Sequence, residues 1–195
     1  MKKLLITGFE PFGGESINPA WEAVSLLPDK IGDFELIKLC IPVVFKVAAE
    51  KVINIATSIS PDAILCIGQA GGRNAITPEL VGLNLRHAPI PDNNGNQPID
   101  EPIIANGANA LFSTLPVRKI AQAIQKAGLP SQVSYSAGAY VCNDVLYSLL
   151  AHFEHSETKV GFIHIPYCLE QNKQPSMPLN DAIQGLKVAI ENLSE

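Results

Sequence analysis

The stretch Ala63-Ile64-Leu65-Cys66-Ile67-Gly68 is a short, continuous apolar run that ends in a glycine. Such a run is typical of a strand that is buried on both faces of a parallel sheet. Comparable runs recur along the chain, and stretches with the 3.6-residue period of a helix separate them. This alternation predicts an α/β fold in which helices cover both faces of a parallel sheet.

Start and stop signals delimit several of the predicted elements. Asn18-Pro19 predicts an N-cap followed by proline at the first helical position. Gly128, followed by Pro130, predicts the end of another helix. The expected strands are Lys3–Gly8, Glu35–Ile41, Ala63–Gly68, Gln132–Ser136 and Val160–Ile165, and the expected helices are Pro19–Leu27, Phe45–Ser58, Pro116–Ala127, Val141–Phe153 and Met177–Leu193.

The segment between about Gly68 and Thr114 has no clear period and is rich in Gly, Asn and Pro. Irregular segments of this length are usually functional loops or small hairpins. Within it, Asn94-Gly95 predicts the turn of a hairpin.

Composition limits the classes of function. The chain has 195 residues, 47% of them hydrophobic, which fits one compact domain spanning residues 1–195. A formal net charge of −5 and scattered basic residues argue against a nucleic-acid partner. No apolar run approaches the ~20 residues of a membrane helix, and residues 1–8 predict a first strand rather than a signal peptide. Four cysteines without CxxC pairing predict a cytoplasmic protein with reduced thiols.

Cys142 has the sequence surroundings of a nucleophile. It follows the small-residue stretch Ser136–Tyr140 and precedes a helical run, which places it in the first turn of a helix. Unpaired N–H groups and the positive end of the helix dipole favour a thiolate there and could stabilise an oxyanion. The alternative is a cysteine that packs beneath the helix start. Cys40 and Cys66 are expected to be buried in strands, and Cys168 to be incidental.

A cysteine nucleophile needs a general base, and His164 is the best-placed histidine. It ends an apolar strand, and sites in parallel α/β sheets form at the carboxyl ends of strands, although a histidine at a strand end is also common in purely structural roles. His152 and His155 lie at the polar end of a predicted helix, and His87 lies in the irregular segment. Glu79 is a candidate for the carboxylate that orients the base, or alternatively marks the start of a helix.

Two glycine-rich stretches follow predicted strands. Residues 8–14 (Gly-Phe-Glu-Pro-Phe-Gly-Gly) lack the GxGxxG spacing of a dinucleotide-binding loop. They place Phe9 and Phe12 on a rigid turn, which suits the clamping of a flat, mostly apolar ligand. Residues 68–73 (Gly-Gln-Ala-Gly-Gly-Arg) place Arg73 after glycines, which is a weak signal for phosphate binding.

Six motifs together resemble a known family. In chain order they are Gly8–Gly14 with Asn18-Pro19, Gly68–Arg73, Ile90–Asn93, Phe112–Pro116, Ser136–Gly138 with Val141–Asn143, and Gly161–Tyr167. They span nearly the whole chain and resemble the pyrrolidone-carboxylate peptidases (pyroglutamyl peptidase I), a family of cysteine peptidases. Six matches in the same order make this resemblance highly specific.

The resemblance implies a fold, a catalytic set and a substrate. The fold is a three-layer α/β/α sandwich with a mostly parallel twisted central sheet, commonly assembled as a homotetramer. The substrates are peptides with an N-terminal pyroglutamate, cleaved through a thioester acyl-enzyme, and no metal or organic cofactor is implied. The catalytic residues carried over are Glu79, Cys142 and His164, and the substrate-binding residues are Phe9, Phe12, Asn18 and Gln69.

The residue types suit this substrate. Pyroglutamate has no free α-amine, and its five-membered lactam is flat and neutral, with one N–H and one C=O. Two aromatic rings can enclose its faces while amide groups satisfy its two polar atoms. A charged pocket would add a desolvation cost without a compensating contact.

Two positions depart from the family pattern. Pro89 stands where an arginine near the active centre is common, with Arg86 three residues earlier, and Leu80 stands where arginine is frequent after Glu79. These departures keep open an alternative, a divergent, weakly active or inactive member that binds pyroglutamyl peptide ends. A more remote alternative is another acyl-transfer or phosphate-dependent reaction on the same fold.

Overall fold

The fold is built on a six-stranded sheet with strand order β2-β3-β1-β4-β8-β5. The computed structural model describes residues 1–194. Strands β3, β1, β4 and β8 run parallel, whereas β2 and β5 are antiparallel to their neighbours at the two edges. The strands of this sheet are β1 (Lys2–Phe9), β2 (Lys30–Ile31), β3 (Phe34–Ile41), β4 (Ala63–Gln69), β5 (Thr77–Pro78) and β8 (Lys159–Ile165).

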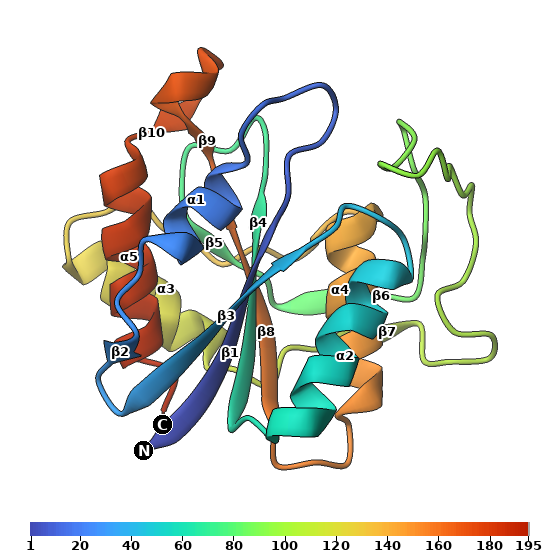
Figure 1. Ribbon diagram of the computed structural model, residues 1–195, viewed down its shortest axis with the longest axis horizontal. Helices are drawn as coiled ribbons and strands as arrows, with labels where there is room; N and C mark the ends of the chain where they lie inside the picture. Colours follow the sequence, from blue (N-terminus) through green and yellow to red (C-terminus); the bar gives the residue numbers. More distant parts are fainter. Residues whose placement is uncertain (195) are drawn as a thin grey trace.

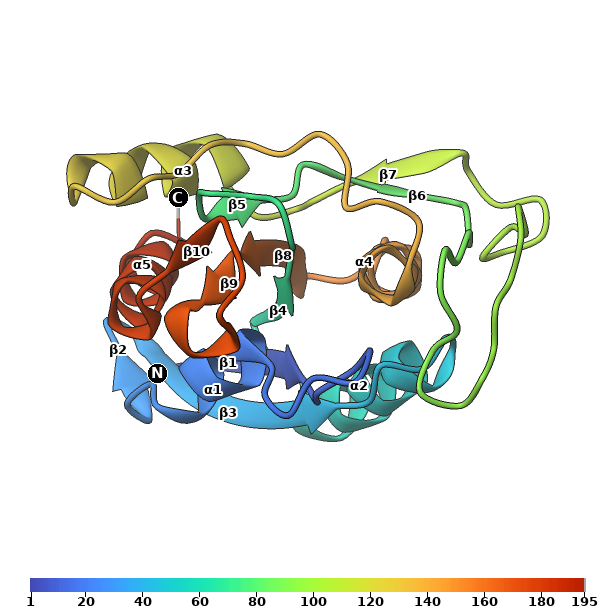
Figure 2. The ribbon, with the colours of Figure 1, turned by 90° about the horizontal axis from the view of Figure 1, so that it is seen from above.

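Helices cover both faces of the sheet, which confirms the predicted α/β/α sandwich (Figures 1 and 2). Alternate residues of a strand point to opposite faces, so Leu4 and Leu65 enter one core cluster, while Leu5 and Ile64 enter the other. Helices α1 (Pro19–Ser25), α3 (Val117–Lys126) and α5 (Leu179–Glu191) pack on the first cluster, and α2 (Val47–Ile59) and α4 (Val141–His152) pack on the second.

The expected strand Gln132–Ser136 is wrong. Two isolated bridges, Ile76 to Ser131 and Glu79 to Ser134, flank β5 on this side, and no continuous ladder joins them. The physical reason lies in Pro78, which has no N–H to donate and therefore interrupts the parallel ladder between these bridges. The other four strands and all five helices lie where they were predicted, with ends that differ by up to two residues.

The irregular segment contains one small hairpin, but not at the predicted turn. Strand β6 (Val81–Leu83) pairs antiparallel with β7 (Ala110–Phe112), and the long connection between them extends beyond α4 (Figure 1). Asn94-Gly95 does form a turn, in which the Gly95 N–H donates to the Asp92 carbonyl at 3.0 Å. The hairpin is wrong, however, because the Asp92 carboxylate accepts the N–H groups of Asn94 and Asn96 and no strands flank the turn.

The predicted N-cap at Asn18 is confirmed, because its side chain accepts the Ala20 N–H at 3.1 Å. Gly128 has the expected left-handed conformation, with φ +84°. After β8 the chain forms β9 (Tyr167–Cys168), the 3₁₀ helix η1 (Leu169–Gln171) and β10 (Ser176–Met177). No helix among residues 1–194 is long and apolar enough to cross a membrane.

The contact between β1 and α1 requires a glycine at position 8. A Cβ on Gly8 would lie 2.7 Å from the Trp21 Cα and 2.8 Å from the Ala20 carbonyl oxygen, both of them backbone atoms.

We expect Gly8→Ala to lower the free energy of unfolding by about 1–3 kcal/mol, because α1 has to move. Urea unfolding measures the change. The exposed-loop control Ser16→Ala should stay within about 0.5 kcal/mol of wild type, and an equal effect of both substitutions would contradict the steric explanation.

Candidate active site

A cavity of about 230 Å³ opens at the carboxyl ends of β1, β4 and β8. This is the edge at which parallel α/β sheets form their sites. It is lined by Phe9, Phe12, Asn18, Val43, Gln69, Ala70, Gly71, Arg73, Ala137, Gly138, Tyr140, Cys142 and His164. Six of the seven residues predicted from the sequence therefore line one cavity, and the seventh, Glu79, is buried behind His164.

Cys142 lies in the first turn of α4, as predicted. Its half-buried sulfur lies above the end of β4, so that a Cβ on Gly68 would be only 3.0 Å from Sγ. No side chain caps this helix start. Within residues 1–194, no other residue accepts a hydrogen bond from the N–H groups of Val141, Cys142 and Asn143. Free donors beside the sulfur are the arrangement that an oxyanion requires.

His164, on β8, is held by Glu79. Its Nδ1 lies 2.7 Å from Glu79 Oε1, and both side chains are almost completely buried. A carboxylate partner fixes the proton on Nδ1 and leaves Nε2 as a proton acceptor toward the cavity. The His164 ring also packs on Phe162, with the ring centroids 4.7 Å apart, so its orientation is fixed from two sides.

Glu79 follows β5 rather than starting a helix. Strand β5 runs antiparallel to β8, with Thr77 opposite His164. The Glu79 N–H donates to the Phe162 carbonyl at 2.9 Å. This pairing at the edge of the sheet brings Glu79 next to a histidine that is 85 residues away in the chain.

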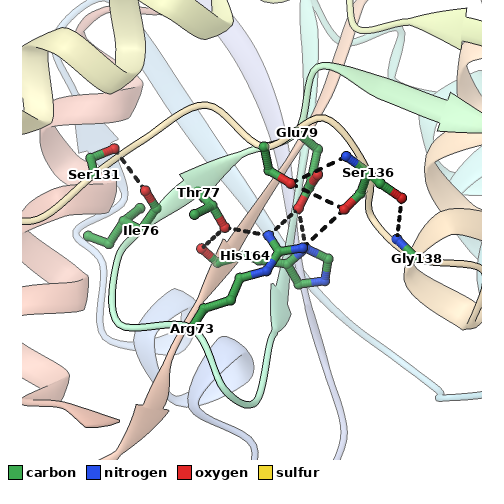
Figure 3. A network of polar contacts seen from close by, with 9 residues as sticks. Arg73, Ile76, Thr77, Glu79, Ser131, Ser136, Gly138 and His164 are labelled. Atoms are coloured by element: carbon green, nitrogen blue, oxygen red, sulfur yellow. Dashed lines mark hydrogen bonds and ion pairs between the residues drawn. The ribbon is translucent and has the colours of Figure 1, made fainter. Parts of the chain in front are cut away.

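Arg73 is a third member of this network, and its predicted phosphate role finds no support in its contacts. Its Nη1 donates to Glu79 Oε1 and Thr77 Oγ1, at 2.6 Å in each case, and its Nη2 donates to the Ser136 carbonyl at 3.0 Å. Figure 3 shows these contacts, with His164 bonded to the same carboxylate. The sequence signal that could have revealed this role is the short spacing between Arg73, Thr77 and Glu79.

The environment sets the protonation states of these groups. Burial would raise the pKa of Glu79, but the hydrogen bond and charge of His164, together with Ser134 and Arg73, bring the pKa below its ordinary value. Burial lowers the pKa of His164 against the opposing effect of Glu79, and Arg73 lowers it further. Burial raises the pKa of Cys142 to about 12, and the charge of Glu79 adds to this increase. These directions favour a thiol paired with an uncharged imidazole when no ligand is bound.

The remaining predicted residues contribute apolar surface and amides. Phe9 is buried and packs on Phe162, whereas the half-buried Phe12 lies 6.3 Å, between ring centroids, from Tyr140. Tyr140 also lines the cavity and was missed from the sequence, because nothing in its neighbourhood predicts where its ring points. Asn18 both lines the cavity and binds the backbone, since its Nδ2 donates to the Glu10 carbonyl at 2.9 Å.

Arg86 does not take the place of the arginine that is common in the family at the position of Pro89. Its Nε donates to Asp144 Oδ1 at 2.7 Å, and the side chain lines a different hollow. Pro89 is exposed, and Leu80 is anchored through its backbone, with its N–H donating to the Ser134 carbonyl at 2.8 Å. Among the described residues, Arg73 is thus the only arginine that lines the cavity of Cys142.

The other cysteines and histidines lie outside this cavity. Cys66 and Cys168 are buried, and Cys40 is half-buried. His87 pairs with the exposed Asp100 at 2.9 Å, and His152 ends α4. No group of three or more His, Cys, Asp or Glu residues within residues 1–194 is arranged to hold a metal ion.

Comparison with known proteins agrees with this geometry. The family described as pyroglutamyl peptidase matches residues 2–195. The chain belongs to this family. It is 51% identical over 195 residues to pyrrolidone-carboxylate peptidase 1 of Streptococcus pneumoniae serotype 4, covering 97% of this chain and 91% of that protein. It is 48% identical over 199 residues to a pyrrolidone-carboxylate peptidase of Staphylococcus carnosus, covering 99% and 93%.

Solved structures show the same fold. Pyroglutamyl peptidase I of Bacillus amyloliquefaciens superposes with a TM-score of 0.94 at 43% identity, over 99% of this chain and 97% of that chain. The pyrrolidone carboxyl peptidase of Thermococcus litoralis superposes with a TM-score of 0.94 at 37% identity, over 99% and 93%. The resemblance read from the six motifs is confirmed.

The charge of Arg73 should affect the pH dependence of the site. Because Arg73 lowers the pKa of His164, Arg73→Gln should raise that pKa, and the imidazole should then become protonated at a higher pH. We expect kcat/KM for a pyroglutamyl amide to decline earlier on acidification in Arg73→Gln than in wild type. A pH–rate profile measures this shift, with the exposed Arg118→Gln on α3 as the control. Coincident acid limbs in wild type and Arg73→Gln would contradict the coupling.

Proposed function

We propose that this protein is a cysteine peptidase that removes pyroglutamate from the N-terminus of peptides. One observation carries the proposal beyond the family membership. The cavity that holds Cys142 and His164 is lined by aromatic, small and amide side chains and by Arg73, and no Asp or Glu within residues 1–194 lines it. An N-terminal ammonium would find no counter-ion on this wall, whereas a neutral lactam fits.

The proposed reaction is acyl transfer to sulfur. Cys142 Sγ attacks the carbonyl carbon that follows the lactam ring, and His164 Nε2 takes the thiol proton during the attack. The N–H groups at the start of α4 stabilise the oxyanion. His164 then gives the proton to the departing amine, and afterwards activates the water that hydrolyses the thioester. Glu79 orients the imidazole and stabilises its charged form.

The proposed binding of the lactam uses the four remaining predicted residues. Phe9 and Phe12 flank the ring, with Tyr140 beside Phe12. Asn18 and Gln69 lie at the wall of the same cavity and provide amide groups for the polar atoms of the ring. The volume of about 230 Å³ suits one small ring and its acyl carbon, rather than a longer side chain.

Release of a chromophore from a pyroglutamyl amide tests this proposal. We expect wild-type protein to cleave it, and a thiol alkylator to abolish cleavage. Cys142→Ser should keep the fold and lose turnover by about a thousandfold or more, because the hydroxyl is a far weaker nucleophile. Cys40→Ser, at another half-buried cysteine, is the matched control and should retain wild-type turnover. Full activity of Cys142→Ser would contradict the assignment.

The same assay separates the alternatives. A divergent member that only binds pyroglutamyl ends would retain the ligand without releasing the chromophore. A nucleophile and a base oriented by a buried carboxylate favour catalysis, since a binding module needs neither. A phosphate-dependent reaction would show turnover that requires added phosphate, whereas the contacts of Arg73 with Glu79, Thr77 and Ser136 already occupy its guanidinium.

We also propose that the protein is a cytoplasmic homotetramer. The assembly is carried over from the family resemblance, and the location is supported by the four cysteines, which are all free. Light scattering coupled to size exclusion should give a mass of four times 20.9 kDa. A mass of 20.9 kDa across the concentration range would contradict the tetramer.

A further inference from the structure

The segment after β8 reaches back to the cavity through Gln171. This residue ends η1, and its side chain hydrogen-bonds to three residues. One is the neighbouring Cys168 of β9; the other two are distant in sequence, Glu15 in the β1–α1 loop and Gln69 at the end of β4. An ion pair between Lys173 and Glu15 joins the same segment to the same loop. The side chain of Gln171 is therefore held where it can act on the wall of the cavity.

The orientation of the Gln171 amide follows from groups whose hydrogen-bonding roles are unambiguous. Its Oε1 lies 3.1 Å from the backbone N–H of Cys168, which can only donate, so this atom has to be the oxygen. Its Nε2 lies 3.4 Å from the carboxylate of Glu15, which can only accept when ionised. The two contacts therefore give the same orientation of the Gln171 amide, with its NH₂ group toward Gln69.

The orientation of Gln69 follows from that of Gln171. Gln171 Nε2 donates to Gln69 Oε1 at 2.8 Å. The oxygen of Gln69 is therefore used within the protein, and its NH₂ group is the free end of the amide. Gln69 lines the cavity, and its Nε2 donates to no acceptor in the part of the chain that the structure describes.

We propose that Gln171 is a positioning residue that locks the Gln69 amide as a hydrogen-bond donor toward the cavity, and so selects a ring that carries a C=O group. The inference rests on the proposed function and deepens it, because the ring C=O is what distinguishes pyroglutamyl from prolyl. A prolyl ring would leave the Gln69 N–H without a partner. A site built to bind such a group rejects the analogue that lacks it.

The lock matters because a free amide carries no such preference. An unrestrained glutamine can turn its oxygen to the cavity as readily as its NH₂ group. In that orientation the Gln69 oxygen would face the lactam C=O, and two acceptors cannot form a hydrogen bond with each other. Holding the donor in place before the ligand arrives removes the cost of selecting one rotamer on binding.

A double-mutant cycle tests whether Gln171 acts through Gln69. In the otherwise wild-type protein, Gln171→Met should raise KM for a chromogenic pyroglutamyl amide about fivefold or more, with kcat within about twofold of wild type. In a Gln69→Met background, the same substitution should change KM little, because the amide it orients is absent. Gln171→Asn, which keeps an amide but falls one methylene short, should behave like Gln171→Met.

An equal effect of Gln171→Met in both backgrounds would overturn the proposal, since Gln171 would then act other than through Gln69. An unchanged KM in the otherwise wild-type protein would overturn it as well. Failure of the wild-type protein itself to cleave the amide would contradict the proposed function instead. The two kinds of failure are therefore distinguishable.

A second variant tests the polarity of the lock with 2-pyrrolidone, the bare lactam, as a competitive inhibitor. In Gln171→Glu, a carboxylate faces Gln69 and draws the NH₂ group of Gln69 away from the cavity. We expect the inhibition constant to rise about tenfold or more, and further than in Gln171→Met. Gln184→Glu, exposed on α5, adds the same charge elsewhere and should leave the constant unchanged. Inhibition of Gln171→Glu as strong as that of Gln171→Met would overturn the assigned polarity.

Discussion

The buried carboxylate of Glu79 is the constraint on which the rest of the site depends. Its side chain has no exposure to solvent, and a charge in that position requires partners. His164 and Arg73 share one of its oxygens, at 2.7 and 2.6 Å, while Oε2 has no hydrogen-bond partner within residues 1–194. An unpaired buried oxygen costs about 1–3 kcal/mol, so the contacts with His164 and Arg73, together with the nearby Ser134 side chain, have to offset this cost.

That arrangement also determines the electrostatic character of the cavity. Glu79 stabilises a positive charge on His164, whereas Arg73 opposes it. The Glu79 side chain is fully buried, and the Arg73 side chain is 27% exposed. Burial and Arg73 lower the pKa of His164, which favours the uncharged imidazole that a general base requires. Because the carboxylate lies behind His164 and does not line the cavity, the ligand meets amides, aromatic rings and one guanidinium. Such a wall binds a neutral ring at a lower desolvation cost than a charged group.

The elements of the sandwich could be predicted because their signals are local. Asn18 caps α1 with its own side chain, and the continuous apolar run of residues 63–68 forms β4 as expected. The strand prediction for Gln132–Ser136 was wrong for a reason that lies elsewhere in the chain. Pro78, in the neighbouring segment, has no N–H to donate to the ladder. The Asn94-Gly95 hairpin failed because the Asp92 side chain, rather than a strand ladder, organises the turn. Both errors concern contacts with a neighbouring group that periodicity does not describe.

The sequence by itself determined the α/β class, the helix start at Cys142, the strand end at His164 and, through six motifs, the family. These features depend on local periodicity, capping and motif order, and so they are readable along the chain. Only the tertiary structure decided that Arg73 serves Glu79, that Arg86 serves Asp144 instead of the cavity, and that Gln171 orients Gln69 across 102 positions of sequence. Side-chain hydrogen bonds of this kind depend on which strand ends and loops meet in space, and the packing of the sheet and its helices determines that.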